Sequence, residues 1–414
     1  MEFRAEKHAS RHPAESYALL QDAFLRATAE PAGALDALLG AQPDYMPAHL
    51  LRIAKAVVAK DAAAFPELRR ALEAVKPHAH RANERDRMYF AAAEAWLEHR
   101  PLLAAHIYST ISAQAPDDLL ALRLAQSCWF FLGRRKKVHE VAEQAVRMLP
   151  GNGPGHDIAL AMLAFGFAEI DDAVRSEEFA RQSLDREPRS PYAIHALAHA
   201  LGAQGRSADA ARTLRERQAD WRIGGRMDSH IAWHLAVFEL ASGHVTNAVT
   251  SLDADLLPAA ALGASGAGDA TDLAWRLDLA GIDTHSRWRP IADGWSRHVK
   301  PGFWSQHDVL AGLAYHRAGQ HRRWHSLRHQ LEVGPYPRIC ALRSVRRTTL
   351  PALHAIEAFT GGAFDAASGA LRTAIKSMGG SLLQRDLFAL MLNESDRRRH
   401  LAFARSPAAS RIPA

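Results

Sequence analysis

The feature that most constrains this sequence is a glycine turn that recurs at a nearly fixed spacing. Each of these glycines lies in a polar segment between two apolar stretches that are long enough to form a helix. They are Gly133, Gly205, Gly243, Gly281 and Gly319, and the last three steps are 38 residues each. A unit of this length is typical of helix–turn–helix solenoids, in which a helix pair buries its apolar face only by stacking on its neighbours.

The same period extends over most of the 414 residues. The 72 residues from Gly133 to Gly205 fit one repeat of 38 and one of 34. Continuing the period in both directions places further turns at Asp61, His99, Asp171 and Gly362. Glycine suits such turns because it readily adopts the left-handed conformation that ends a helix. The sequence therefore predicts about nine helix pairs.

The composition agrees with a helical fold. Hydrophobic residues make up 48% of the chain and charged residues 23%, and alanine and leucine outnumber the β-branched residues. We predict an all-α, tetratricopeptide-like α-solenoid in one domain, residues 1–414, and leave open whether it closes into a compact superhelix. Residues 1–115 are expected to form degenerate helix pairs, 116–325 the clearest repeats, 326–400 the C-terminal pairs and 401–414 a tail.

Three local expectations follow from this division. The small-residue segment Pro258–Gly268 is expected to form a loop inside the array. Leu197 and Leu235 are expected to occupy packing positions of their repeats.

Several classes of protein are excluded by the residues that are scarce. Cys128 and Cys340 are the only cysteines, so the sequence predicts neither a disulfide framework nor a cysteine metal site. The chain shows no apolar signal-peptide region and no apolar run that could span a bilayer, which predicts a cytoplasmic protein without a membrane partner. The net charge is +6, but the basic clusters are scattered at turns, so no nucleic-acid partner is predicted. A homo-oligomer is left open.

Two predicted first helices each carry a pair of histidines. His195 and His199 lie in Tyr192–Gln204, and His230 and His234 lie in Ser229–Ser242. Because each pair is spaced i, i+4, both of its rings lie on one helix face, and the repeat frame turns that face toward the concave groove. Histidine titrates near neutral pH and also binds metals.

Three roles remain open for these four histidines. They are local structural hydrogen bonding, ligand binding or acid–base catalysis, and metal binding. A divalent metal is ranked last because catalytic zinc sites often include a carboxylate and no HExxH pattern is present. No cofactor is predicted, since the chain has no P-loop, Rossmann fingerprint or nucleophile elbow.

Further polar and aromatic residues fall at groove positions or beside glycine turns. The candidate ligand-binding residues are Trp233, Asp269, Asp272, Trp275, Arg276, Asp308, Gln384 and Arg385. For Arg276 an ion pair between helices is favoured over a contact with a ligand.

Taken together, these motifs resemble the tetratricopeptide repeat protein 38 family, which is known from bacteria and animals. The resemblance runs from about Asp118 to Asp396 and rests on segments in a fixed order. They are HALAHALGAQGR (195–206), SHIAWH (229–234), Asp269 with WRLDLAG (275–281), Arg287 with Trp288, and GGSLLQRDLF (379–388). It implies a soluble, single-domain, all-helical repeat protein and brings no reaction with it.

This chain departs from the family pattern at three polar positions. Leu201–Gly202 replaces an acidic residue, Leu382 replaces a polar one, and Leu310 replaces a histidine in a segment that keeps Asp308.

Two functional hypotheses remain open. The first is a closed pocket that binds a small polar or anionic ligand, with His195, His199, His230 and His234 available for acid–base catalysis, with or without a metal. The second is a protein-interaction scaffold whose concave groove binds a peptide or a partner helix. The convergence of histidines in the middle of the array favours the pocket.

Overall fold

A computed structural model describes residues 12–334 and 344–404 of the chain. Every regular element in these residues is a helix, and no strand occurs among them, which confirms the all-α prediction. None of the described helices has the length and apolarity to cross a membrane. The contacts divide the chain after Val245 into two compact units, and each is described here by itself.

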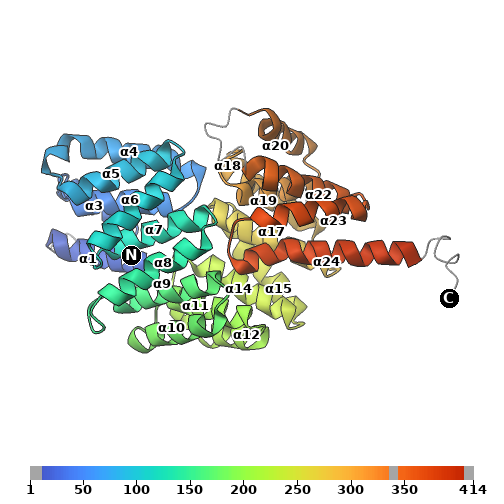
Figure 1. Ribbon diagram of the computed structural model, residues 1–414, viewed down its shortest axis with the longest axis horizontal. Helices are drawn as coiled ribbons and strands as arrows, with labels where there is room; N and C mark the ends of the chain where they lie inside the picture. The colour runs from blue at the N-terminus through green and yellow to red at the C-terminus, as the bar shows by residue number, and fades with distance from the viewer. Residues whose placement is uncertain (1–11, 335–343, 405–414) are drawn as a thin grey trace. The chain divides into compact units, whose positions relative to one another are not determined.

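Unit 1 is a run of antiparallel helix pairs (Figure 1). Its helices are α1 (Pro13–Arg26), α2 (Ala34–Ala41), α3 (Met46–Val58), α4 (Phe65–Val75), α5 (Glu84–Leu97), α6 (Pro101–Gln114), α7 (Leu119–Phe131), α8 (Arg135–Met148), α9 (His156–Glu169), α10 (Ala173–Arg186), α11 (Pro191–Ala203), α12 (Ser207–Glu216), α13 (Gln218–Trp221) and α14 (Asp228–Ala241). Each pair packs on the next along the chain, as α9 does on both α10 and α11.

Unit 2 continues the same alternation of helices. It contains α15 (Val245–Ser251), α16 (Leu257–Ala260), α17 (Ala264–Leu279), α18 (Trp288–His298), α19 (Ser305–Arg317), α20 (His321–Val333), α22 (Leu350–Thr360), α23 (Phe364–Ala374) and α24 (Leu382–Ala404). The chain is thus a tetratricopeptide-like helical-repeat protein. The two first helices predicted at Tyr192–Gln204 and Ser229–Ser242 correspond to α11 and α14.

The turn inside each pair contains one residue with a left-handed backbone. These residues are Lys60, His99, Gly133, Asp171, Gly205, Gly243, Gly281, Gly319 and Gly362. The predicted turns are therefore confirmed, with the first one shifted by a single position. Asp61 instead accepts a hydrogen bond from the amide of Ala63 and caps the next helical turn.

The loop predicted at Pro258–Gly268 is wrong, because most of this segment is helical. It contributes to α16 and to the first turns of α17. Its small residues serve close packing instead: a Cβ at Gly266 would lie 2.3 Å from the carbonyl oxygen of Ala259. Alanine favours helix, and glycine here permits two backbones to touch.

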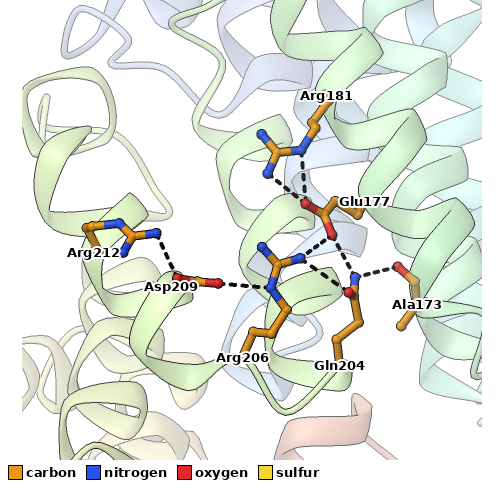
Figure 2. A network of polar contacts seen from close by, with 7 residues as sticks. All are labelled: Ala173, Glu177, Arg181, Gln204, Arg206, Asp209 and Arg212. Carbon is orange, nitrogen blue, oxygen red and sulfur yellow. Dashed lines mark hydrogen bonds and ion pairs between the residues drawn. The ribbon is translucent and has the colours of Figure 1, made fainter.

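Polar side chains of α10 and of the turn at Gly205 link two successive repeats of unit 1 (Figure 2). The amide of Gln204 donates to the carbonyl of Ala173 at 3.2 Å and to Glu177 at 2.8 Å. Arg206 donates to the same Glu177 carboxylate at 2.7 Å. Burial alone would raise the pKa of Glu177, but hydrogen bonds from Arg181 and Gln204 lower it. The turn at Gly205 is thereby tied to α10 of the preceding repeat.

The two predicted packing leucines differ in burial. Leu197 is 2% exposed, whereas Leu235 is half-buried and lies outside the core. We expect Leu197→Ala to lower the free energy of unfolding by about 2–5 kcal/mol, because it opens a cavity that neighbouring helices cannot fill. Leu235→Ala serves as the matched control and should cost less. Urea denaturation followed by circular dichroism measures both, and equal losses would contradict this difference in burial.

Candidate functional site

The four predicted histidines converge in unit 1. Each offers one ring nitrogen, and these four atoms all lie within 4.8 Å of one another. His195, His199 and His234 are buried, and His230 is partly exposed. The Nε2 atoms of His195 and His199 are 3.1 Å apart. The i, i+4 spacing on two neighbouring first helices therefore yields one cluster, which we call the histidine cluster.

Local sequence explains how each helix presents its pair. The hydroxyl of Ser190 caps α11, and Pro191 occupies its first turn, where a missing amide hydrogen is harmless. Small residues then keep α11 slender, so that it is buried on all sides. A Cβ on Gly202 would lie 2.7 Å from the ring of Phe238 in α14. Gly202 therefore permits the close approach of α11 and α14 that brings the rings together.

The rings of the histidine cluster pack mainly edge to face. The ring centroids of His195 and His199 lie 4.5 Å apart, as do those of His199 and His234. His230 lies 4.8 Å from His234 and 5.1 Å from His195. Trp233, fully buried, stacks on His230 at 5.2 Å and so fixes its plane.

The surroundings of the buried His195 ring favour its neutral form. Burial, followed by repulsion from His199 and His230, lowers the pKa of His195 well below its usual range. Arg123 and Arg226 contribute to the same effect, which places both guanidinium groups near this ring.

Three cations lie next to the histidine cluster, and we call them the cationic cluster: Lys60, Arg123 and Arg226. Each lies over an aromatic ring. Arg123 is 4.0 Å from the centroid of Tyr192, Lys60 is 5.4 Å from Phe130, and Arg226 is 5.2 Å from Phe24. The Phe165 ring in turn lies between Phe130 at 5.7 Å and His195 at 6.0 Å. An unbroken series of ring contacts therefore joins the two clusters.

The cations of this cluster form no close ion pair in the described residues, although the Glu30 carboxylate attracts Arg226 from a longer range. None of the three forms an ion pair within the described parts of the chain, and the Nε of buried Arg123 has no hydrogen-bond partner there. Burial, with repulsion from Arg123 and Arg226, lowers the pKa of Lys60 to about 7. Desolvation, with repulsion from Arg123, lowers the pKa of Arg226 to about 9, although its side chain is accessible to water.

The N-terminal helix lies across this part of unit 1. Helix α1 contacts α7 and α11 as well as its neighbour α3. Arg26 at its end forms a bidentate ion pair with Asp157 at the start of α9. Arg226 donates to the carbonyl of Phe24 at 3.3 Å. Unit 1 therefore closes on itself beside the two clusters.

Another predicted group lies in unit 2 and is centred on Arg276. Its guanidinium donates to Asp272 at 2.6 Å, to Asp386 at 3.2 Å and to the carbonyl of Leu383 at 2.7 Å. Arg276 and Asp272 are both buried. These contacts join α17 to α24, which agrees with the favoured interpretation of Arg276 as a residue that pairs between helices.

The remaining predicted residues of unit 2 also make structural contacts. Trp275 packs against Trp288 and Phe359. Buried Asp308 accepts from the amide of Gly302, and burial raises its pKa well above the usual range. Asp269 is buried, the Gln384 side chain accepts from the amide of Ser381 at 3.0 Å, and Arg385 donates to the carbonyl of Gly380 at 2.5 Å. Their roles as ligand-binding residues stay predictions.

The cationic cluster was not predicted from the sequence. Arg123 carried a usable signal, since it is a single cation within the apolar run LLALRLAQSCWFF. Lys60 lies one position from the predicted turn at Asp61, and its left-handed backbone is unusual for a residue with a side chain. Arg226 follows two glycines and carried no signal of its own.

The chain resembles several solved helical-repeat structures. The hetero-tetramer Cut9–Hcn1 of APC/C shares 14% identity, and the match covers 83% of this chain and 63% of that one, with a TM-score of 0.44. This chain thus spans less than two thirds of that structure. The human IFIT1 dimer with m7Gppp-AAAA shares 16% identity over 88% and 95% of the two chains, with a TM-score of 0.46. Yeast Tom70 shares 11% over 91% and 86%, with a TM-score of 0.43. No family model matches the chain.

We expect Gly202→Ala to destabilise unit 1 by about 1–3 kcal/mol, because the added methyl group overlaps the Phe238 ring. Gly40→Ala is the matched control: it also lies in a helix, and its Cβ meets nothing within 4 Å. That change should be neutral or slightly stabilising. Thermal and urea unfolding measure both variants, and an unchanged midpoint for Gly202→Ala would exclude the close approach as a constraint.

Proposed function

We propose that unit 1 binds a small anionic ligand whose charged group contacts Lys60, Arg123 and Arg226 and whose apolar or planar part lies among the neighbouring rings. The observation that carries the proposal is the convergence of these three cations, without ion-pair partners in the described residues, beside four histidines. Arg123 is buried and Lys60 is partly buried, and taking such cations out of water costs free energy unless an opposite charge accompanies them. An anion from solution would supply that charge.

The aromatic residues define the rest of the ligand. Tyr192 and Phe165 are buried, and Phe130 is partly exposed, so the surface beside the cations is apolar. A carboxylate, phosphate or sulfonate on a planar body matches this combination of charge and rings. In this proposal the histidine cluster, which ring contacts through Phe165 join to the cations, acts on the bound molecule by acid–base chemistry or as a set of ligands.

The alternative is a scaffold that binds a peptide or partner helix, a common use of helical repeats. The comparisons with solved structures add no weight to the small-molecule hypothesis over this one. Within unit 1, however, α1 contacts the first helices α3, α7 and α11, which favours a compact site over a long open groove. The absence of a nucleic-acid partner and membership in the tetratricopeptide repeat protein 38 family stay predictions as well.

A titration with benzenesulfonate tests the proposal, because its negative charge does not change with pH. We expect the wild type to bind benzenesulfonate and to discriminate against the neutral methyl phenyl sulfone. A hydrogen bond to a charged group contributes about 1.5–3 kcal/mol, so Lys60→Gln or Arg226→Gln should weaken binding about ten- to hundredfold. Isothermal titration calorimetry on chelator-treated protein measures the affinities.

Arg222→Gln is the matched control for this titration. Arg222 is an exposed arginine four residues before Arg226. It lies over the Trp221 ring and is not a member of the cationic cluster. Its replacement should leave the affinity unchanged. Equal losses in all three variants, or equal binding of the neutral sulfone, would show that the cationic cluster does not select an anion. A wild-type protein that does not bind benzenesulfonate would leave the scaffold as the better hypothesis.

The proposal also predicts a pH dependence that belongs to Lys60. The groups around its ammonium are Arg123 and Cys128 on α7 and Arg226 before α14, and its pKa of about 7 lies far below that of an ordinary lysine. Lys60 is protonated below this pKa, so benzenesulfonate should bind more tightly at about pH 6 than at about pH 8.5. Lys60→Gln should flatten the profile. A wild-type affinity that is constant over this range would contradict the role of Lys60.

A further inference from the structure

We propose that His195, His199, His230 and His234 form a binding site for a first-row divalent transition-metal ion, with Zn²⁺ as the best match. All four residues offer ring nitrogens within 4.8 Å of one another, from two helices of one unit. This inference rests on the proposed function only for the ligand that completes the metal's coordination. The four nitrogen ligands themselves come from the chain.

The distances within the histidine cluster fit a single ion. Imidazole nitrogens bind Zn²⁺ at about 2.0–2.1 Å, so two of them on a tetrahedral ion lie about 3.3 Å apart. The Nε2 atoms of His195 and His199 are already 3.1 Å apart. The widest separation in the set exceeds the tetrahedral value by about 1.5 Å, which small ring rotations of two histidines can close.

The spacing of the four histidines on their helices and the aromatic residues around them also suit a metal site. Each helix supplies an i, i+4 pair, so both rings of a pair project from one face with little freedom. Trp233 stacks on His230, and Phe165 lies edge-on to His199 at 5.3 Å. These contacts hold the rings in place from outside the histidine cluster, as the surroundings of a metal centre do.

The chemistry of the ligand set selects the metal. Four imidazoles without a carboxylate or thiolate suit zinc, copper, nickel or cobalt and do not suit Mg²⁺ or Ca²⁺, which require oxygen ligands. The partly exposed His230 marks the side from which solvent or an exchangeable ligand would approach.

The charge of the surroundings determines what completes the site. Neutral imidazoles leave the ion's two positive charges uncompensated, and Arg123 and Arg226 lie close enough to affect His195. A hydroxide ion or the anionic group of the proposed ligand would therefore be favoured as a fifth ligand, which expands the tetrahedral set that the four imidazoles form by themselves. The structure thus assigns the metal and the anion to neighbouring positions on one face of unit 1.

Cobalt(II) chloride added to untagged, chelator-treated protein tests the metal site. Calorimetry should give one Co²⁺ per chain, and visible absorption should show the intense bands of a tetrahedral nitrogen-ligated ion. Changes outside the ligand set typically cost 10- to 100-fold in metal affinity. His230→Ala and His199→Ala remove ligands, so each should weaken binding by at least about 100-fold. The His199→Ala variant can fail to fold because His199 is buried. His230 is partly exposed, so the Co²⁺ affinity and the helicity of the His230→Ala variant are the decisive measurements.

His80→Ala is the matched control, since His80 is an exposed histidine of the same unit. It should bind Co²⁺ as the wild type does. Wild-type protein that shows neither stoichiometric binding nor tetrahedral bands, or a folded His230→Ala variant that binds like His80→Ala, would overturn the inference. Benzenesulfonate binding to the metal-free protein is measured separately, so failure of the metal site and failure of the proposed function give different results.

Discussion

Close approach between first helices is the constraint on which the rest of unit 1 depends. Packed helices usually lie 8–10 Å apart, and small side chains bring them to the short end of that range. Helix α11 is rich in alanine and ends its apolar run at Gly202, where the Phe238 ring occupies the space of a side chain. The Phe238 ring lies against Gly202, and the two i, i+4 histidine pairs of α11 and α14 form one cluster. A packing requirement thus produces the chemical feature.

The same part of unit 1 concentrates positive charge, and its three cations form no ion pair with any residue that the structure describes. Elsewhere in unit 1 arginines are neutralised locally, as Arg181 and Arg206 are by Glu177. Lys60, Arg123 and Arg226 instead lie over aromatic rings, an arrangement worth about 0.5–2 kcal/mol per contact. That compensates part of the desolvation of each cation and leaves its charge available. Keeping three such cations together costs free energy, and an anionic ligand that supplies the missing charge would compensate this cost.

Local rules made part of this structure predictable. The turns followed from the left-handed backbone that ends a helix, and the shared face of each histidine pair followed from helical periodicity. The cationic cluster could not be found in this way, because Lys60, Arg123 and Arg226 meet only when α1 and the segment before α14 close onto α7 and α11. Small residues are also ambiguous: the segment Pro258–Gly268 suggested a loop, yet there glycine serves contact between backbones.

The two neighbouring clusters are linked thermodynamically whatever the identity of their ligands. A dication bound by neutral imidazoles raises the positive potential at Arg123 and Arg226, which favours an anion there. An anion bound first lowers the cost of introducing the dication, and by reciprocity each changes the affinity of the other by the same factor. An anion that also coordinates the metal gains from both effects. A site with this arrangement would bind a molecule that combines a coordinating oxygen with a planar apolar part more tightly than it binds an anion that cannot coordinate the metal.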